Sequence, residues 1–437
     1  MRSFLSECVA NVSAYKVRPQ DFTRDRKLDF LSICEFMLPL LKKGLQTELN
    51  LFFEDTGKTC TKSAFCQARE KIKPEFFKDM YKHSVDAFYK FQLEKGKNRF
   101  KGYRLWACDS SVQVLPDNES TRKLGLGTGK SKDTEIASVK IGAYYDIKAQ
   151  IIGLVDIFDA KKSDLFCCAE SQISQVPADV ISIYDRGYCS QLVGYLHNYY
   201  GTKYVCRMKI TSSTTVNNFF NSAETDILVT EKLTVKCAKK LKEMGFEVTK
   251  ETTVSYRLVK VTLPTGEIEI LQTNLGADFS IADLSYIYKC RWGVETCFKG
   301  LKSNQMLAIF SGYSDIAVTQ DLWINLLFYN LETITLCATE RELEKINQKR
   351  KNNPSKNKKK ENKGYQVNRN IGVGTLRMEY RELFTCKDSQ LDAHIKKIAQ
   401  LYLMSLEAKY EKKVQPVVDK LKKRKRHYTE SNYKRAI

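Results

Sequence analysis

The sequence predicts an α/β protein in which a mixed sheet follows a helical region. Three observations support this fold class. Apolar residues recur at helical spacing in the first 98 residues, whereas strand patterns alternate with helical ones from residue 103 onward. The chain has 437 residues, of which 43% are hydrophobic and 11% aromatic. This is enough apolar material to bury a large core in two or three domains.

Residues 1–98 are predicted to form a helical N-terminal domain. Helical patterning covers 28–53 and 61–91, and Pro74 interrupts the second run. Basic residues occupy the outward positions. Two interpretations stay open: a small domain that binds the ends of a DNA element, and a helical cap packed on the next domain.

Residues 99–210 are predicted to form the first part of the sheet domain. The expected elements are strands 103–115, 137–146 and 151–158, helix 164–175, strand 179–184, helix 190–199 and strand 203–209. Three strands followed by helix, strand, helix and strand is the order of an RNase H-like core, a mixed sheet flanked by helices.

Residues 211–274 are expected to be a largely β insertion into this core. Strand patterns cover 253–263 and 267–272, and a lysine-rich helical patch covers 235–244. A helical pattern resumes at residue 281 and continues to about residue 304. Residues 275–340 are therefore predicted to complete the core.

Two basic segments follow the core. Residues 341–370 begin with a charged helical pattern after Thr339 and contain the lysine- and asparagine-rich run 349–363, whose polar composition predicts a flexible segment. Residues 371–437 are predicted to be helical with a basic tail. Flexible lysine-rich segments bind a phosphate backbone without needing a fixed shape. The alternative is that both runs only increase solubility.

Composition restricts the class of partner. Lys and Arg number 72 against 51 acidic residues, a formal charge of +21, which favours nucleic acid first and an anionic membrane surface second.

The most apolar stretches, 30–41 and 322–338, are interrupted by polar residues, so we expect buried helices and no membrane span. Fourteen cysteines include no Cys-x-x-Cys pair, so we expect free thiols rather than zinc.

Two aspartates lie at the ends of predicted strands. Asp109 stands in the sequence ACDSS, and Asp185 stands in IYDRGY. A single aspartate in such a position is more often a turn or cap residue. Two of them, on strands that an RNase H-like core places side by side, favour a metal site.

The strongest functional signal is the segment 288–302, YKCRWGVETCFKGLK. On a helix of about 100° per residue, one sector holds a tyrosine, one acid and three cations: Tyr288, Arg291, Glu295, Lys299 and Lys302. We expect this stripe to be exposed. The alternative is a solvated face with one Arg291–Glu295 pair, worth about 0.2–0.5 kcal/mol. Three cations around one acid suit a metal and a phosphate better.

Phosphodiester cleavage accounts for this set of carboxylates. Two metal ions about 3.5–4 Å apart can activate the attacking oxygen and stabilise the leaving oxygen. Mg²⁺ prefers oxygen ligands and shares the substrate phosphate, and we expect Mn²⁺ to substitute for it. We therefore predict Asp109, Asp185 and Glu295 as the catalytic residues and the ligands of two Mg²⁺ ions.

The motifs resemble those of a known family. The spacing Tyr288-x₂-Arg291-x₃-Glu295-x₆-Lys302 resembles the signature of IS4-family insertion-sequence transposases, which are of the DDE type. The sequences around Asp109 and Asp185 are similar to those of the family's first and second catalytic aspartates. The resemblance covers roughly residues 103–311. It implies metal-dependent DNA cleavage at transposon ends and transfer of the 3′ ends into target DNA.

The resemblance also implies roles for the residues around Glu295. Tyr288, Arg291 and Lys302 are implied to contact DNA near the cleaved end, and we add Lys299 as a further DNA contact. Trp292 has two open interpretations: stacking on a base, and core packing.

The resemblance implies partners and a location as well. Double-stranded DNA, as element ends and as target, is the expected substrate, and a homodimer would pair the two ends. We expect a bacterial, cytoplasmic, nucleoid-associated protein. One residue departs from the family pattern: Ser110 stands where many relatives have glycine.

Three other functions remain in view. One is a transposase-derived DNA-binding protein without catalysis, which the presence of all three carboxylates disfavours. Another is an RNase H-like nuclease that cuts without strand transfer, since hydrolysis and transfer use the same residues. An RNA-binding module would carry aromatic signature motifs, which this sequence lacks.

Overall fold

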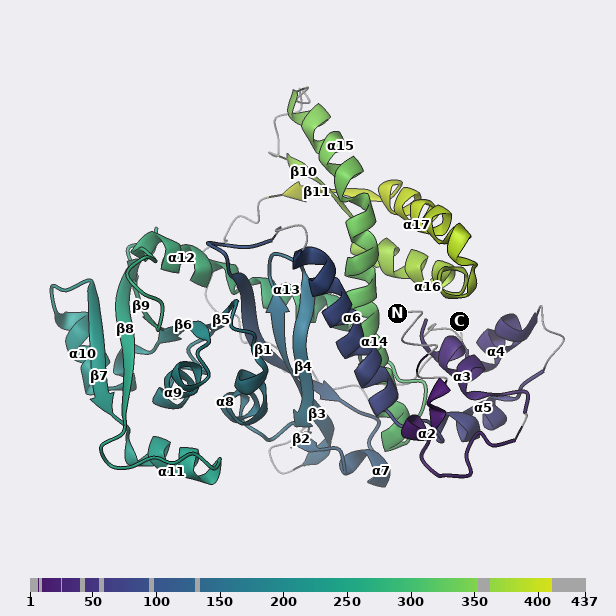
Figure 1. The fold of residues 1–437 in the computed structure, drawn as a ribbon, viewed down its shortest axis with the longest axis horizontal. Helices are drawn as coiled ribbons and strands as arrows, with labels where there is room; N and C mark the ends of the chain where they lie inside the picture. Colours follow the sequence, from purple (N-terminus) through teal and green to yellow (C-terminus); the bar gives the residue numbers. More distant parts are fainter. Residues whose placement is uncertain are drawn as a thin grey trace.

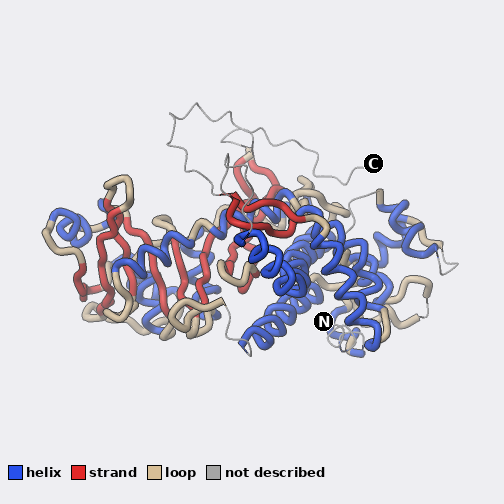
Figure 2. The backbone as a smooth tube through the Cα atoms, turned by 90° about the horizontal axis from the view of Figure 1, so that it is seen from above, coloured by secondary structure: helices blue, strands red, loops and turns tan. Residues whose placement is uncertain are grey.

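The structure is a computed structural model that describes residues 7, 10–24, 26–39, 44–54, 59–93, 98–129, 134–352 and 362–410. Its centre is a nine-stranded sheet in the order β2-β3-β1-β5-β6-β9-β8-β7, with β4 paired to β3. The strands gather at one end of the molecule and the N-terminal helices at the other (Figure 1, Figure 2). The sheet strands are β1 (Arg104–Val114), β2 (Leu126–Thr128), β3 (Glu135–Asp146), β4 (Ile151–Asp159), β5 (Val180–Tyr184), β6 (Lys203–Met208), β7 (Asp226–Lys232), β8 (Thr253–Thr262) and β9 (Ile268–Thr273).

The core of the sheet confirms the predicted fold class. β1, β3 and β4 are antiparallel neighbours, and β5 and β6 then add parallel to β1. Helices α8 (Asp164–Cys167) and α9 (Gln191–Tyr199) precede β5 and β6 respectively. The arrangement is the RNase H-like order, strand-strand-strand-helix-strand-helix-strand, in a mixed sheet.

Helices cover both faces of this sheet. The α8–α9 side packs on one face, and the helices after the sheet pack on the other. These later helices are α12 (Ile281–Cys290), α13 (Gly293–Ser303) and α14 (Asp315–Leu336). The long N-terminal helix α6 (Glu75–Leu93) lies against α14 (Figure 1).

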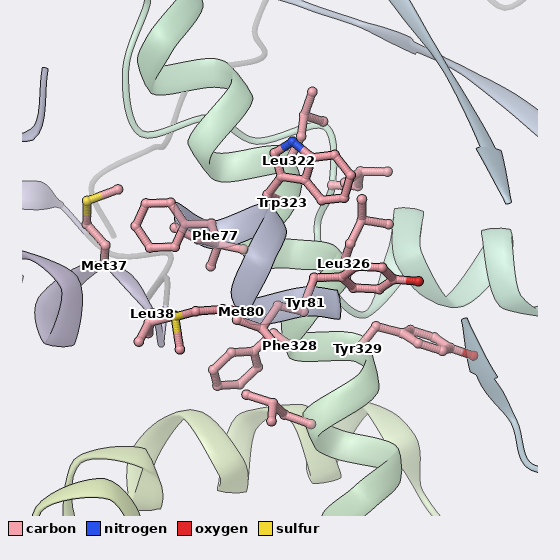
Figure 3. Close-up of a cluster of buried hydrophobic side chains, with 14 of the residues drawn as sticks. Met37, Leu38, Phe77, Met80, Tyr81, Leu322, Trp323, Leu326, Phe328 and Tyr329 are labelled. Atoms are coloured by element: carbon pink, nitrogen blue, oxygen red, sulfur yellow. The ribbon is translucent and has the colours of Figure 1, made fainter. Parts of the chain in front are cut away.

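Helix α14 is the apolar axis on which the N-terminal region packs. The N-terminal helices are α2 (Val12–Tyr15), α3 (Phe30–Met37), α4 (Leu45–Phe53), α5 (Lys62–Arg69) and α6. Leu322, Trp323 and Leu326 of α14 meet Phe77 and Tyr81 of α6 in one buried cluster (Figure 3). Residues 322–338 were predicted to be a buried helix, and α14 and the short 3₁₀ turn after it occupy the whole of that range. In the described part of the chain, no helix is both long enough and apolar enough to cross a membrane.

The segment predicted as a β insertion extends the main sheet. β9 pairs with β6 in the antiparallel sense, with Thr273 opposite Val205, and β8 and β7 follow outward. Helices α10 (Thr214–Asn221) and α11 (Val235–Glu243) accompany these strands. α10 and β7 were not predicted. β7 alternates exposed and half-buried residues at the sheet edge, which gives it a weak apolar pattern.

The segment 341–370 was predicted to begin as a charged helix and then to be flexible; the helix is present, but the described end of the segment forms a strand that was not predicted. Residues 341–352 belong to α15 (Glu340–Asn352), and 362–367 form β10 (Asn362–Val367), which pairs with β11 (Leu406–Tyr410). Side chains join the two ends, because the Asn347 side chain bonds the backbone of Tyr365. Residues 353–361 and the basic tail 411–437 lie outside the described residues. Between the strands lie α16 (Arg369–Thr385) and α17 (Asp388–Leu403).

Candidate active site

Two aspartates come together just beyond the last residues that pair the parallel strands β1 and β5. Asp109 was predicted at a strand end, which is wrong, because β1 continues to Val114 and Asp109 lies in its middle, opposite Ala143 of β3. β1 and β5 pair with Ala107 opposite Ile183, and two residues further on come Asp109 and Asp185. Side chains alternate along a strand, so each aspartate lies on the same face as the apolar residue two positions before it. That face is the one covered by α12 and α13. Both aspartates are half-buried.

The helical segment that carries Glu295 is broken just before that residue. One continuous helix was expected here, but α12 ends at Cys290 and α13 begins at Gly293. The amide of Arg291 bonds the Tyr288 carbonyl (3.0 Å) in a tighter, i to i−3 pattern. Gly293 permits a close approach to the β3–β4 turn, because a Cβ there would lie 3.1 Å from Ile147.

This break changes the direction of the first two residues of the predicted stripe. Tyr288 and Arg291 are only 8% and 6% exposed, so the expectation of one exposed stripe is wrong for them. The Tyr288 hydroxyl donates to Asp185 Oδ1 (3.3 Å), and Arg291 Nη2 donates to Glu295 Oε1 (3.1 Å). Both side chains therefore contact the carboxylates.

The remaining predicted contact residues are open to solvent. Glu295, Lys299 and Lys302 are exposed, and the Glu295 side chain retains 45% of its surface. Trp292 is 62% exposed, which rules out core packing for it. The guanidinium of Arg291 lies 4.9 Å from the centre of the Trp292 ring, a cation–π geometry.

The carboxylates and Arg291 share one electrostatic environment. Burial raises the pKa of Asp109 to about 6, with further increases from the charges of Glu295 and Asp164. The Ser110 amide, 2.8 Å from Asp109 Oδ1, and the charge of Arg291 lower that pKa. Burial opposes the charge of Arg291, yet Asp185, Tyr288 and Glu295 hold its pKa above the ordinary value.

Arg291 also has an unused donor. Its Nε is buried and has no hydrogen-bond partner among the described residues. A buried donor without an acceptor is costly. The guanidinium can therefore accommodate one more acceptor without giving up Glu295.

The residues present fit a divalent metal by their chemistry. Three carboxylates supply the oxygen ligands that Mg²⁺ prefers. Their oxygens do not all lie within 4.8 Å of one another, since within the described residues only Glu379, Glu382 and His394 form such a group. Arg291 interacts with each of the three carboxylates of the site. The negative charges of the three carboxylates repel one another and the pKa of Asp109 is raised. A divalent cation bound between them would offset both effects.

Several residues beside this site were not predicted from the sequence. Asp164 Oδ1 accepts hydrogen bonds from Ser110 Oγ (2.6 Å) and Lys140 Nζ (2.8 Å). In sequence Asp164 is only an acid in the first turn of a short helix, and Lys140 is one residue of an apolar strand. Only the pairing of β1 with β3 brings Lys140 near Ser110, so no local motif could have identified them.

A buried hydrogen-bond chain supports the end of β5. The Tyr184 hydroxyl bonds the Tyr144 hydroxyl (2.7 Å) and His197 Nε2 (2.8 Å). His197 Nδ1 in turn bonds Thr202 (2.6 Å). Burial lowers the pKa of His197 to about 3, so the ring is neutral. These hydrogen bonds fix the position of Tyr184, the residue that immediately precedes Asp185.

A sheet of RNase H-like order with one acidic residue within β1 and another directly after β5 defines a class of DNA-processing domain. Residues 101–331, more than half of the chain, match the family described as Transposase DDE domain, and the chain belongs to this family. Members generally use divalent metal ions. The finer assignment to the IS4 group stays a prediction.

Two further comparisons complete the picture. The chain is similar to a piggyBac transposase in a cryo-EM structure of its synaptic complex with hairpin DNA, with 12% sequence identity and a TM-score of 0.43. The alignment covers 91% of this chain and 82% of that one. None of the curated proteins compared with the chain matches it.

Proposed function

We propose that the chain is a DDE transposase of the IS4 type. It would cleave DNA at transposon ends and join the 3′ ends to target DNA. The observation that carries this proposal is that Asp109 and Asp185 occupy matching positions, two residues beyond the last pair of the parallel strands β1 and β5, with Arg291 linking them to Glu295. Membership of the transposase DDE family supports it.

The protein's own residues fix the geometry of the reaction. Asp109, Asp185 and Glu295 would hold two Mg²⁺ ions, which activate the attacking oxygen and stabilise the leaving one. The paired strands hold the two aspartates rigidly. The Tyr288 hydroxyl donates to Asp185 and limits its rotation. The free Nε of Arg291 can donate to a phosphate oxygen, which helps to place the scissile bond.

The exposed residues around Glu295 would hold the DNA. Lys299 and Lys302 lie on the solvent side of α13 and suit phosphate contacts. Trp292 offers an open ring for stacking on a base. We propose double-stranded DNA as the partner, in line with the net charge of +21, and a homodimer that pairs two ends. The proposed location is the bacterial nucleoid.

The test is cleavage of a plasmid that carries the gene's own flanking ends. Wild-type protein is compared with Glu295→Gln and with Glu344→Gln, a matched change at an exposed acid on α15. We expect cuts at the ends that need Mg²⁺, disappear with EDTA or Glu295→Gln, and persist in Glu344→Gln. Some products should be joined to target DNA.

The rival functions give different products. Nicked or linear DNA without joined products would identify a nuclease that only hydrolyses. Binding to the ends without any metal-dependent cut would identify a DNA-binding protein without catalysis, and the roles of the three carboxylates would have to be withdrawn.

A further inference from the structure

A second face of α13 lines a cleft beside the candidate active site. Glu295 bonds Arg291 and its charge acts on Asp109. Thr296, about 100° round the helix, lines the cleft together with Lys299 and Ser303. The cleft has a volume of about 650 Å³. Its other walls come from the β3–β4 turn, α14, α15, α16 and the β10–β11 pair. Figure 1 shows α15 and the β10–β11 pair together beyond the end of α14.

Cations from four separate segments converge on this cleft. They are Lys148 of the β3–β4 turn, Lys299 of α13, Arg369 of α16 and Lys409 of β11. Lys299 and Lys409 are exposed and form no ion pair with any described residue. Cations contributed by distant parts of the chain can follow an extended polyanion, whereas a compact anion needs them gathered at one point.

Three acids also line the cleft, and two of them are engaged. Glu332 is 1% exposed and pairs with Arg369 (3.4 Å), and Arg377 also favours its charge. Glu407 accepts a hydrogen bond from Gln366 Nε2 (2.7 Å). Glu340, the third, lies in the first turn of α15, where the helix dipole offsets its charge. Because Arg369 and Glu332 pair with each other, three lysines and two acids remain to set the charge of the cleft, a small positive excess.

A buried donor faces this cleft without an acceptor. Gln305 lines it, is fully buried, and uses its Oε1 to accept from Arg377 Nη2 (3.0 Å). Its Nε2 has no partner among the described residues. Leaving such a donor unpaired costs about 1–3 kcal/mol. A phosphate oxygen in the cleft would supply the missing acceptor.

An aromatic pair stands next to the same cleft. Tyr286, 41% exposed, stacks on Phe100 with ring centres 5.0 Å apart. Lys148 Nζ donates to the Tyr286 hydroxyl (2.7 Å) and lies 5.2 Å from the ring centre. Proteins that bind single-stranded DNA stack bases on aromatic rings and hold the phosphate backbone in a cationic groove.

We propose that this cleft binds the backbone of one DNA strand that leads to the carboxylates, with Tyr286 stacking on an unpaired base. That the strand leads to the carboxylates rests on the proposed function. That the cleft binds a DNA strand does not depend on it. It adds Lys148, Arg369, Lys409 and Tyr286 to the DNA-binding residues.

The test measures DNA binding over a range of salt concentrations with the full chain in EDTA. The Lys148→Ala/Lys409→Ala protein is compared with Lys239→Ala/Lys396→Ala, which removes two exposed lysines elsewhere. The slope of log affinity against log salt should fall by about 1.4–1.8, since each of the two lost phosphate contacts contributes about 0.7–0.9. The control should keep the wild-type slope, and both proteins should keep the wild-type Tm.

A third variant separates backbone contact from stacking. Tyr286→Ala should weaken binding of a single-stranded oligonucleotide about tenfold and leave a blunt duplex nearly unaffected. An unchanged salt slope in Lys148→Ala/Lys409→Ala would overturn the proposal, as would an equal loss in the control. The measurement is repeated in Glu295→Gln protein. If the wild-type protein shows no Mg²⁺-dependent cleavage while Lys148→Ala/Lys409→Ala still reduces the salt slope, the transposase proposal is removed and the cleft remains.

Discussion

Two arginine–carboxylate pairs in this molecule differ in how completely they are bonded. Arg69 and Asp321, where the N-terminal region meets α14, are almost fully buried. Every nitrogen of Arg69 has an acceptor, from Gln320, Ser311, Asp321 and the Ala317 carbonyl. At the candidate active site, Arg291 is also buried, but its Nε has no described partner and Glu295 stays 45% exposed.

The difference separates a structural pair from one that can exchange partners. Breaking a fully satisfied buried pair leaves a charge with no compensation. A half-exposed carboxylate gains little from its pair, because water can replace the arginine. We therefore expect the first pair to set stability and the second to set activity.

The largest expected effect is at Asp321. Asp321→Ala leaves the Arg69 guanidinium buried without its counter-charge and should lower the free energy of unfolding by about 3–5 kcal/mol. Urea denaturation measures this loss. Glu295→Gln, measured in parallel, should change stability by less than about 1 kcal/mol. Equal losses in the two variants would remove the distinction between the pairs.

The next largest effect is expected on the rate of DNA cleavage when Arg291 is changed. Arg291→Lys keeps the charge but loses the planar donor group, and it should reduce cleavage at the transposon ends about 100-fold. Tm should fall by only a few degrees. Cleavage rates measured in Mg²⁺ check this prediction. Arg341→Lys, on the exposed face of α15, is the matched control. A rate that stays within twofold of wild type would place Arg291 outside the reaction.

The raised pKa of Asp109 predicts that metal binding depends on pH. Its pKa is raised to about 6, so protons compete with the metal below that pH, and Mg²⁺ affinity should fall up to about tenfold per pH unit. Titrations between pH 5 and about 8 follow this. Above about pH 6 the affinity should level off, and a constant affinity through acid pH would contradict the assignment.

The same shift has an opposite consequence for the metal-free protein. A raised pKa in the folded state means that the folded state binds the proton more tightly than the unfolded one. Stability should therefore fall as pH rises from the ordinary value of 3.8 to about 6. Asp109→Asn should flatten this window, which thermal unfolding in EDTA can measure.

The smallest effect on the fold is expected at Trp292. Trp292→Ala removes a ring that is 62% exposed and should change stability by about 0.5 kcal/mol or less. DNA affinity should still fall about tenfold if the ring stacks on a base. Trp323→Ala is the contrast, because that ring is 5% exposed in the α14 core and its loss should cost about 3–5 kcal/mol. Unchanged DNA affinity in Trp292→Ala would exclude stacking.

The sequence predicted the parts of the site that depend on strand order. Asp109 and Asp185 each follow an apolar run, and the RNase H-like order makes those two strands neighbours. Alternation along the strands then places both acids on one face. These relations are local patterns combined with a small set of sheet topologies, so they can be read without coordinates.

Other parts depend on contacts between distant segments. The break before Gly293 follows from its approach to Ile147, and a helix projection cannot contain that contact. The burial of Arg291 follows from the break. The edge strand β7 and the β10–β11 pair lack a strong apolar alternation, and they form because a partner strand is present. Lys140 comes near Ser110 only through the pairing of β1 with β3.

The central claim is that Asp109, Asp185 and Glu295 act together on the same metal ions. Mn²⁺ binding to the protein in complex with a duplex of the element end, counted by electron paramagnetic resonance, tests it most directly. Two ions should bind to the wild type and to Glu344→Gln. Asp109→Asn, Asp185→Asn and Glu295→Gln should each lose at least one ion. Two ions bound with unchanged affinity in all three variants would contradict the claim.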